Sequence, residues 1–289
     1  MTAIHANLLL LLTALIWGCG FVAQRMGTDH VGPFTFNGVR FALGACVLIP
    51  VMLRVKMAPP AYLSKASAWK RYLLGGGLAG AALFAGATLQ QIGIMTTTAG
   101  KAGFITGLYV VMVPLMGLAF KQRPGLGTWI GAVLAVAGMY LLSVTESFSL
   151  TPGDTFVLIG AVFWAVHVLV IGWLSPRMDP IRLAAAQFGA CSVLSLIAAA
   201  STESITFSGL AGASGALLFS GLVSVGVAYT LQVVAQRQAK PAHAAIILSL
   251  EAAFAALAGW LFLNEILTMK EFLGCGLMLG GMLASQLRS

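Results

Sequence analysis

Charged residues are scarce in this chain. Its 289 residues include 16 Lys and Arg and 8 Asp and Glu, or 8% of the sequence, whereas soluble domains carry about 25%. So few charges cannot cover a water-facing surface, which excludes a soluble enzyme, a disordered chain and a fibrous protein. The composition predicts instead an all-α polytopic membrane protein with almost no extramembrane domain.

Cysteines are few, and none is arranged for metal or disulfide chemistry. Cys19, Cys46, Cys191 and Cys275 lie in apolar segments, without Cys-x-x-Cys spacing or a histidine partner. We expect packing residues here, with no metal site and no disulfide framework. A P-loop is absent, which argues against ATP-driven transport, and no cofactor is expected. The net charge of +8 includes no basic run interleaved with aromatics, so nucleic acid is not an expected partner.

What the chain has in abundance is apolar length. Hydrophobic residues make up 59% of it, and the mean hydropathy is +0.96. A helix needs about 20 apolar residues to cross about 30 Å of hydrocarbon. The continuous apolar runs predict ten transmembrane helices, over 6–24, 34–53, 72–93, 101–120, 126–145, 154–173, 181–200, 212–234, 242–263 and 269–287. Pro33 and Pro180 stand at the starts of the second and seventh, where a missing N–H is tolerated.

The basic residues predict how these helices are oriented. If the N-terminus, the even-numbered connections and the C-terminus share one side, that side holds twelve Lys and Arg and the other holds three. Membrane proteins carry this excess on the cytoplasmic side. We therefore expect both termini in the cytoplasm.

An internal repeat divides the chain. Residues 88–90 and 230–232 both read Thr-Leu-Gln, an offset of 142 that also pairs Lys101 with His243 and Tyr109 with Glu251. Pairs at an offset of 147 are Trp17 with Trp164, Pro33 with Pro180 and Phe41 with Phe188. We expect one bundle of two five-helix repeats, 1–147 and 148–289. Because five is odd, the second repeat enters the membrane inverted, an architecture typical of alternating-access transporters whose substrate site lies near the midplane.

Glycine is abundant, with 34 residues, and Gly-x-x-x-Gly spacing occurs at 76/80, 103/107, 127/131 and 276/280. Small residues let helix backbones approach closely in a membrane. These positions are predicted helix-packing surfaces, and some are alternatively sliding contacts between the two repeats.

Several short motifs resemble a known family. Pro241-Ala242, Leu250-Glu251, Leu263-Asn264-Glu265 and Gly274 resemble the second repeat of EamA-type members of the drug/metabolite transporter superfamily, and Pro114, Gly131 and Gly138 form a weaker copy in the first. The resemblance covers nearly the whole chain, although Ala252 and Asn264 stand where the family commonly has Pro and Gly. The chain looks most like bacterial YddG-type exporters of aromatic and other amino acids. This implies a multi-pass protein of the bacterial inner membrane that is not an enzyme.

Two tryptophans are candidates for the substrate site. Trp17 and Trp164 lie near the middle of their predicted helices, whereas tryptophan normally settles at the headgroup level. As repeat partners they are predicted to form an aromatic cavity wall, with bundle filling as the alternative. Thr13 and Gln24 fall on the Trp17 face by helical spacing. His167 shares the Trp164 face, where it contacts substrate, shuttles a proton or bonds a neighbouring helix.

Glu251 is the one acid deep in a predicted helix, a costly position unless the group faces the bundle interior or takes up a proton. It makes a structural hydrogen bond, binds a substrate amino group or couples transport to protons. His243, about 12 Å earlier on the same helix, is a further substrate candidate. Arg40 is a gating candidate that could meet a substrate carboxylate, unless it extends outward to the surface.

The remaining candidates describe an access path. Gln90, Tyr109, Tyr229 and Gln232 are polar or aromatic positions, with Gln90 towards the outside and Gln232 towards the cytoplasm. Hydrogen bonding between helices explains them nearly as well. Gln24 is a gating candidate, and Pro114 frees a backbone carbonyl and is predicted to act as a kink or hinge.

Three functions follow. The first is alternating-access export of amino acids, preferably neutral or aromatic, and of similar small metabolites, with membrane lipid as the other partner. The second is proton-coupled efflux of lipophilic cations through Glu251. The third, an intramembrane hydrolase using Ser224 and His243, lacks both a Gly-x-Ser-x-Gly elbow and a His-Glu-x-x-His motif.

Overall fold

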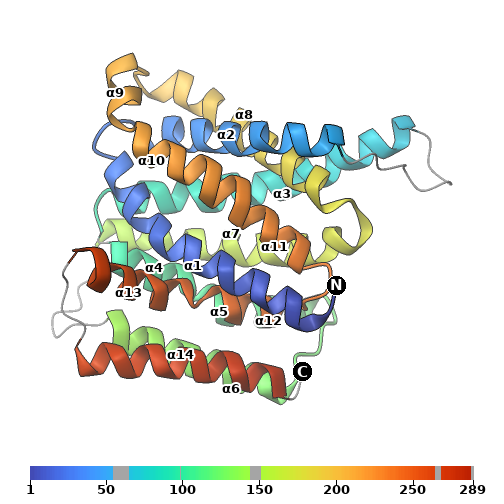
Figure 1. Ribbon diagram of the computed structural model, residues 1–289, viewed down its shortest axis with the longest axis vertical. Coiled ribbons are helices and arrows are strands. Elements are labelled where there is room, and N and C mark those ends of the chain that lie inside the picture. The colour runs from blue at the N-terminus through green and yellow to red at the C-terminus, as the bar shows by residue number, and fades with distance from the viewer. Residues whose placement is uncertain (55–64, 98, 144–150, 264–267, 288–289) are drawn as a thin grey trace.

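The computed structural model describes residues 1–54, 65–97, 99–143, 151–263 and 268–287, and its regular elements are all helical. From the N-terminus they are α1 Ala3–Gly27, α2 Pro33–Arg54, α3 Lys65–Ile94, α4 Ala99–Gly107, α5 Tyr109–Ala119 and α6 Leu126–Ser143. They continue with α7 Pro152–Leu174, η1 Ser175–Arg177, α8 Pro180–Thr202, α9 Phe207–Gly212, α10 Ser214–Leu218, η2 Phe219–Tyr229, α11 Thr230–Ala235, α12 Pro241–Leu248, α13 Glu251–Leu263 and α14 Met269–Leu287. Figure 1 shows them packed as one bundle.

Eight stretches of the described residues are long and apolar enough to cross a membrane. They are Ala3–Gly27, Pro33–Arg54, Trp69–Ile94, Lys101–Ala119, Pro152–Arg177, Pro180–Thr202, Ser214–Ala235 and Pro241–Ala258. Each coincides with a helix expected from hydropathy. α6, with its apolar stretch at Leu126–Leu142, is shorter, and α14 is not among the eight. A polytopic helical protein is therefore confirmed, while the count of ten spans stays a prediction.

Local sequence accounts for where several helices begin. α2 starts at Pro33 and α8 at Pro180, as expected for a residue without an N–H to donate. The Asp179 side chain caps α8 by accepting from the backbone N–H of Arg182 at 2.9 Å. At the start of α7, Thr151 and Asp154 form a capping box.

Glycines bring α6 and α14 into close contact, side by side at one edge of the bundle (Figure 1). A Cβ atom at Gly131 would lie 2.6 Å from the carbonyl oxygen of Gly281, and one at Gly274 would lie 2.6 Å from that of Gly138. The two helices are antiparallel at this contact, because Gly131 and Gly138 along α6 meet Gly281 and Gly274 of α14 in reverse order. By contrast, a Cβ at Gly276 or Gly280 would meet nothing within 4 Å. The expected 276/280 motif is therefore not the packing surface among the described residues.

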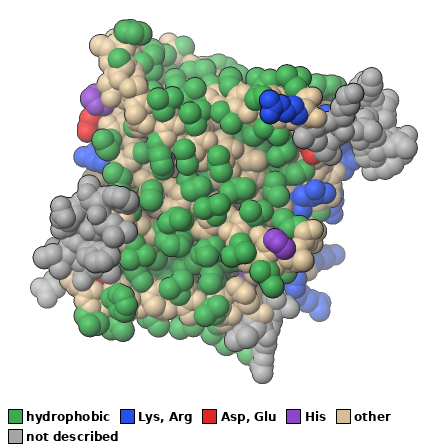
Figure 2. All heavy atoms as spheres, viewed as in Figure 1, with side chains coloured by type: hydrophobic (Ala, Val, Ile, Leu, Met, Phe, Trp, Pro, Cys, Tyr) green, Lys and Arg blue, Asp and Glu red, His purple; other side chains and the backbone are tan. Residues whose placement is uncertain are grey.

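The other main helix contacts join α2 to α8 and α3 to both α7 and α8. α1 contacts η2, α11, α12 and α13, and so lies among the later helices of the chain. In Figure 1, α1 runs away from the bundle end that carries both termini, whereas α7 runs towards it. Most Lys and Arg side chains visible in Figure 2 gather at that same end, and apolar side chains cover the face between the ends.

Candidate functional site

Two spans are interrupted at matching positions. The break between α4 and α5 falls at Leu108, and the break between α12 and α13 falls at Ser249 and Leu250. The backbone N–H groups of Leu108 and Leu250 each donate to the carbonyl three residues earlier, both at 3.2 Å, a tighter turn than an α-helix makes. As a result Tyr109 and Glu251, the first residues after each break, face the bundle interior.

The break in the later span forms although position 252 is alanine, not the proline that the resemblance led us to expect. The Ser249 hydroxyl donates to the Ile246 carbonyl at 2.9 Å, a local bond that competes with helical geometry. Pro114, the expected hinge, lies inside an uninterrupted α5. The interruption of that span is six residues earlier than the proline, and the hinge role of Pro114 stays a prediction.

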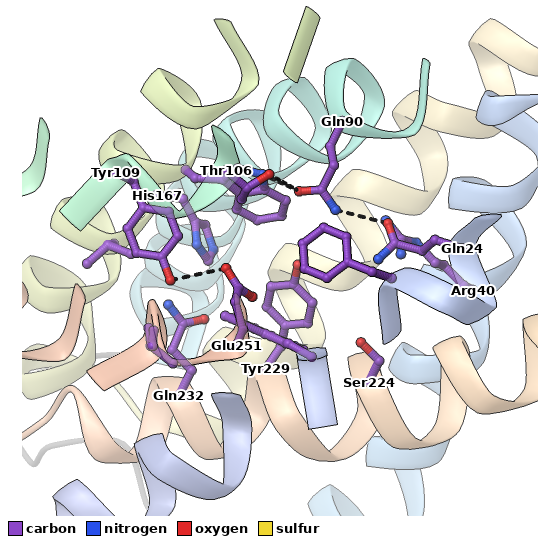
Figure 3. Close-up of a pocket in the computed structure, with 15 residues that line it drawn as sticks. Gln24, Arg40, Gln90, Thr106, Tyr109, His167, Ser224, Tyr229, Gln232 and Glu251 are labelled. Atoms are coloured by element: carbon purple, nitrogen blue, oxygen red, sulfur yellow. Dashed lines mark hydrogen bonds between the residues drawn. The ribbon is translucent and has the colours of Figure 1, made fainter. Parts of the chain in front are cut away.

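A buried cavity with a volume of about 30 Å³ lies beside the two breaks (Figure 3). Its lining residues are Trp17, Phe21, Gln24, Arg40, Gln90, Thr106, Tyr109, Trp164, His167, Val168, Ser224, Tyr229, Gln232, Leu248 and Glu251. One water needs roughly 10–15 Å³ by this measure, so the space holds about two. An amino acid would enter only after the surrounding helices move apart.

Tyr229 lies between the two predicted wall tryptophans. Its ring centroid is 4.4 Å from that of Trp17 and 6.1 Å from that of Trp164, with the latter pair stacked at 26°. Such offset pairs are favourable arrangements of aromatic rings. Trp164 Nε1 donates to Gln90 Oε1 at 2.9 Å, while Trp17 Nε1 is buried and has no partner among the described residues. Three aromatic rings therefore line the cavity together.

A glutamine joins several helices on the other side of the cavity. Gln90 Nε2 donates to Gln24 Oε1 at 3.0 Å, and the Thr106 hydroxyl donates to Gln90 Oε1 at 3.3 Å. With the Trp164 bond, this links α1, α3, α4 and α7. Such a network orders a buried polar site when its groups are satisfied.

Glu251 is buried, at 4% exposure. The Tyr109 hydroxyl donates to its Oε1 at 3.4 Å, as Figure 3 shows. No cation pairs with this carboxyl group among the described residues; the ion pair found there is Lys101 with Asp154, at 2.6 Å. An acid in this setting can bind a cationic group or a proton.

His167 is fully buried between α8 and the cavity. Its Nε2 lies 2.8 Å from Gln187 Oε1 on α8, and its ring lies edge-on to Trp164 at 6.0 Å. It is thus bonded to a neighbouring helix and also lines the cavity. Its other ring nitrogen, Nδ1, is buried, and no described residue bonds it.

Arg40 is 2% exposed and lines the cavity rather than extending to the surface. Its guanidinium carbon lies 5.5 Å from the Phe36 ring centroid and 5.0 Å from that of Phe41. Its Nε is buried and has no hydrogen-bond partner in the part of the chain that the structure describes. The outward alternative is therefore wrong for this side chain.

Three expected site residues do not line the cavity. The Thr13 hydroxyl donates to the carbonyl oxygens of Leu9 and Ala228 at 2.9 and 3.1 Å, which holds it between helices. His243 bonds Ser285 Oγ at 2.9 Å and Asn7 Oδ1 at 3.1 Å. Both of its ring nitrogens are engaged there, so His243 and Ser224 do not bond one another among the described residues. The third, Pro114, lies along α5 away from the lining.

Five lining residues were not predicted as binding residues: Phe21, Thr106, Val168, Ser224 and Leu248. Phe21 is four residues after Trp17, so helical spacing could have identified it. Ser224 is five residues before Tyr229 and shares its face only because η2 is a π-helix. No sequence signal predicts that geometry. Across the described residues, no group of three or more His, Cys, Asp or Glu side chains could hold a metal ion.

Comparison with known proteins identifies similar sequences along nearly the whole chain. The sequence profile described as the EamA-like transporter family matches residues 4–144 and again residues 151–285. An uncharacterized transporter of Archaeoglobus fulgidus is 33% identical, over 99% of this chain and 87% of that protein. The uncharacterized transporter YwfM of Bacillus subtilis is 27% identical, over 96% and 92% of the two chains. A solved crystal structure of 20% identity superposes over 98% of each chain with a TM-score of 0.80, which shows the shared fold.

Proposed function

This chain belongs to the EamA-like transporter family of membrane proteins, and from that membership and the cavity we propose that it exports amino acids. Neutral and aromatic side chains are preferred, and similar small metabolites are also carried, as in YddG-type exporters. The observation that carries this proposal is the buried cavity, in which aromatic rings and single charged groups of opposite sign face one space. A zwitterion with an apolar side chain matches that combination.

The chemistry of the cavity supports this substrate class. The rings of Trp17, Tyr229 and Trp164 present flat apolar surface that can stack an aromatic or aliphatic side chain. An ammonium group is attracted both by Glu251 and by the faces of the rings. A second charge on the substrate would lose its hydration without a further partner, which disfavours charged side chains.

Alternating access is supported by a symmetric contact between helices. Gly131 and Gly274 are separated by the same 143 residues as Gly138 and Gly281. Gly131 packs on Gly281, which is the repeat counterpart of Gly138. In the same way, Gly138 packs on Gly274, which is the repeat counterpart of Gly131. This exchange is the pattern of contacts that a two-fold axis would produce. An axis across two antiparallel membrane helices lies in the membrane plane, as inverted repeats require.

The two ends of the bundle support the same relation. Lys101 Nζ lies 2.6 Å from Asp154 Oδ2, joining α4 to α7. His243, the repeat partner of Lys101, lies 3.1 Å from Asn7 on α1, and Asn7 and Asp154 are separated by the 147 residues of the earlier pairs. We infer that these contacts close the two ends of the access path and open alternately as the repeats 1–147 and 148–289 rock.

The proposed orientation has both termini in the cytoplasm of a bacterial cell, with the protein in its inner membrane. The gathering of Lys and Arg at the end of the bundle that carries both termini supports this, because basic residues are enriched on the cytoplasmic side. The Lys101–Asp154 contact then closes the outer end and the His243–Asn7 contact the cytoplasmic end.

Reconstitution tests the proposed substrate class. In liposomes preloaded with unlabelled phenylalanine, we expect labelled phenylalanine and leucine to exchange at least about 10-fold faster than lysine or glutamate, since a second buried charge lacks a partner. Protein-free liposomes supply the background rate. Exchange of every amino acid at that background would contradict amino-acid transport.

A second function is favoured by Glu251, which is buried without a cationic partner among the described residues. Proton-coupled efflux of lipophilic cations would use this carboxyl group as the exchange site. In that case an imposed pH gradient drives uptake of tetraphenylphosphonium by the wild-type protein, and Glu251→Gln abolishes it.

The same substitution has a different result under amino-acid export. We expect Glu251→Gln to raise the phenylalanine concentration for half-maximal exchange by about 10-fold or more, because the ammonium group loses its charged partner. Tetraphenylphosphonium should not accumulate with either protein. Glu271→Gln, which alters an acid at the start of α14 that bonds Thr268, is the matched control. Unchanged phenylalanine exchange in Glu251→Gln would remove Glu251 from substrate binding.

A further inference from the structure

Arg40 is a buried cation whose partner is missing from the described residues. Its side chain makes no hydrogen bond or ion pair there, and its Nε is buried without an acceptor. The rings of Phe36 and Phe41 flank the guanidinium group and compensate only part of the lost hydration. A buried charge in a membrane helix is otherwise paired, or faces a functional cavity.

Three acids among the described residues bond to groups other than Arg40. Asp154 pairs with Lys101, and Glu203 accepts from the backbone N–H groups of Phe34 and Thr35 at the start of α2, both at 2.8 Å. Glu251 accepts from Tyr109. In Figure 3, Arg40 and Glu251 stand on opposite sides of Tyr229. The cavity thus presents a free cation on one side and an acid on the other.

The free donors of the cavity point to an anion. Arg40 and Trp17 both line this space, and Arg40 Nε and Trp17 Nε1 are buried N–H groups without an acceptor among the described residues. A guanidinium group offers a planar fork of donors that matches the two oxygens of a carboxylate. A phosphate would bring a second negative charge, for which the cavity has no second cation.

We propose that Arg40 is the carboxylate anchor of the site and that its substrates are defined by a single carboxylate attached to an apolar or aromatic side chain. This deepens the proposed function, on which it rests, and extends it to acids that have no amino group. An arylalkanoic acid such as 3-phenylpropionate is then a ligand, whereas the corresponding amine without a carboxylate, phenethylamine, is not. The amino group adds affinity through Glu251 but does not define the class.

The test compares these two compounds on purified protein. Binding is followed by quenching of tryptophan fluorescence, and exchange by competition with labelled phenylalanine in proteoliposomes. For the wild-type protein we expect 3-phenylpropionate to bind and compete, and phenethylamine to be at least about 30-fold weaker, as when one partner of a buried charge pair is removed. Equal competition by the two compounds would overturn the assignment of Arg40.

Variants of Arg40 assign the effect to this residue. Arg40→Gln should weaken 3-phenylpropionate binding by about 30-fold or more. Arg40→Lys keeps the positive charge and should retain part of the wild-type affinity for this compound. Arg177→Gln, which removes an exposed arginine stacked on Trp173, should leave binding unchanged. A folded Arg40→Gln protein with wild-type affinity for 3-phenylpropionate contradicts the proposal. If Arg40→Gln does not fold, Arg40→Lys and the wild-type comparison still decide it.

Failure of this inference differs from failure of the proposed function. Phenylalanine exchange together with equal binding of the acid and the amine would reject the carboxylate anchor and leave amino-acid transport standing. Binding of 3-phenylpropionate that depends on Arg40, without exchange of any amino acid, would reject amino-acid transport and leave the carboxylate site standing.

Discussion

Trp164→Ala is expected to reduce phenylalanine exchange in proteoliposomes by about 10- to 100-fold. The indole of Trp164 stacks on Tyr229 and its Nε1 donates to Gln90 Oε1, so the substitution removes one of the three rings and one of the two hydrogen bonds that this oxygen accepts. Each such loss weakens binding by about 0.5–1.5 kcal/mol, and about 1.4 kcal/mol is a factor of ten, so the two losses together give roughly the expected reduction. Trp164→Phe, which keeps a ring but not the hydrogen bond, should exchange phenylalanine at a rate between those of the wild-type protein and Trp164→Ala.

The control for this prediction is on the same helix. Trp173 is 55% exposed and its ring contacts Arg177 rather than the cavity, so Trp173→Ala should exchange phenylalanine at the wild-type rate. Trp17→Ala should resemble Trp164→Ala, because Trp17 also packs on Tyr229. Normal exchange in folded Trp17→Ala and Trp164→Ala proteins would remove the aromatic wall from the site.

Gly281→Val is expected to destabilise the folded protein by about 1–3 kcal/mol or more, the cost of overpacking a close contact. A Cβ atom at Gly281 would lie 2.7 Å from the carbonyl oxygen of Gly131 and 3.2 Å from the backbone N of Ala135. Backbone atoms cannot rotate away, so α6 and α14 must separate. Thermal unfolding in detergent, followed by the fraction that remains monodisperse on size exclusion, measures the change.

The adjacent glycine is a matched control. A Cβ atom at Gly280 would meet nothing within 4 Å, so Gly280→Val changes the same helix, by the same side chain, without the contact. Its free energy of unfolding should lie within about 0.5 kcal/mol of the wild-type value, as for most surface substitutions. Gly138→Val, at the proposed counterpart of Gly281, should match Gly281→Val. Equal stability of the Gly280 and Gly281 variants would contradict the packing of α6 on α14.

Much of the site was predictable because helical periodicity and the repeat are local properties of the chain. Trp17, Trp164 and Glu251 were identified from depth in a predicted helix, and all three line one cavity. The position of His243 along its helix does not predict which way its side chain points. Its ring nitrogens bond Asn7 and Ser285, and it does not line the cavity. The difference arises because depth depends on one helix, whereas facing direction depends on its neighbours.

The break before Glu251 shows a different limit. Proline is the usual sequence signal for an interrupted membrane helix, and this chain lacks it at position 252. The break is formed by two hydrogen bonds. The Ser249 hydroxyl donates to the Ile246 carbonyl, and the Leu250 N–H donates to the carbonyl three residues earlier instead of four. Serine is common inside regular helices, so its presence does not reveal which bond it makes.

The membrane-embedded helical nature of the chain follows from its residues alone, since the hydrophobic length of each segment is counted along the sequence. So do the proline starts of α2 and α8. Helix packing alone decides three other features of the described residues. Tyr229 separates the two indoles, Arg40 turns inward without a partner, and Gly281 rather than Gly280 meets α6. Those facts depend on how faces of distant helices meet, and a π-helix or a broken turn rotates a face without leaving a trace in the order of residues.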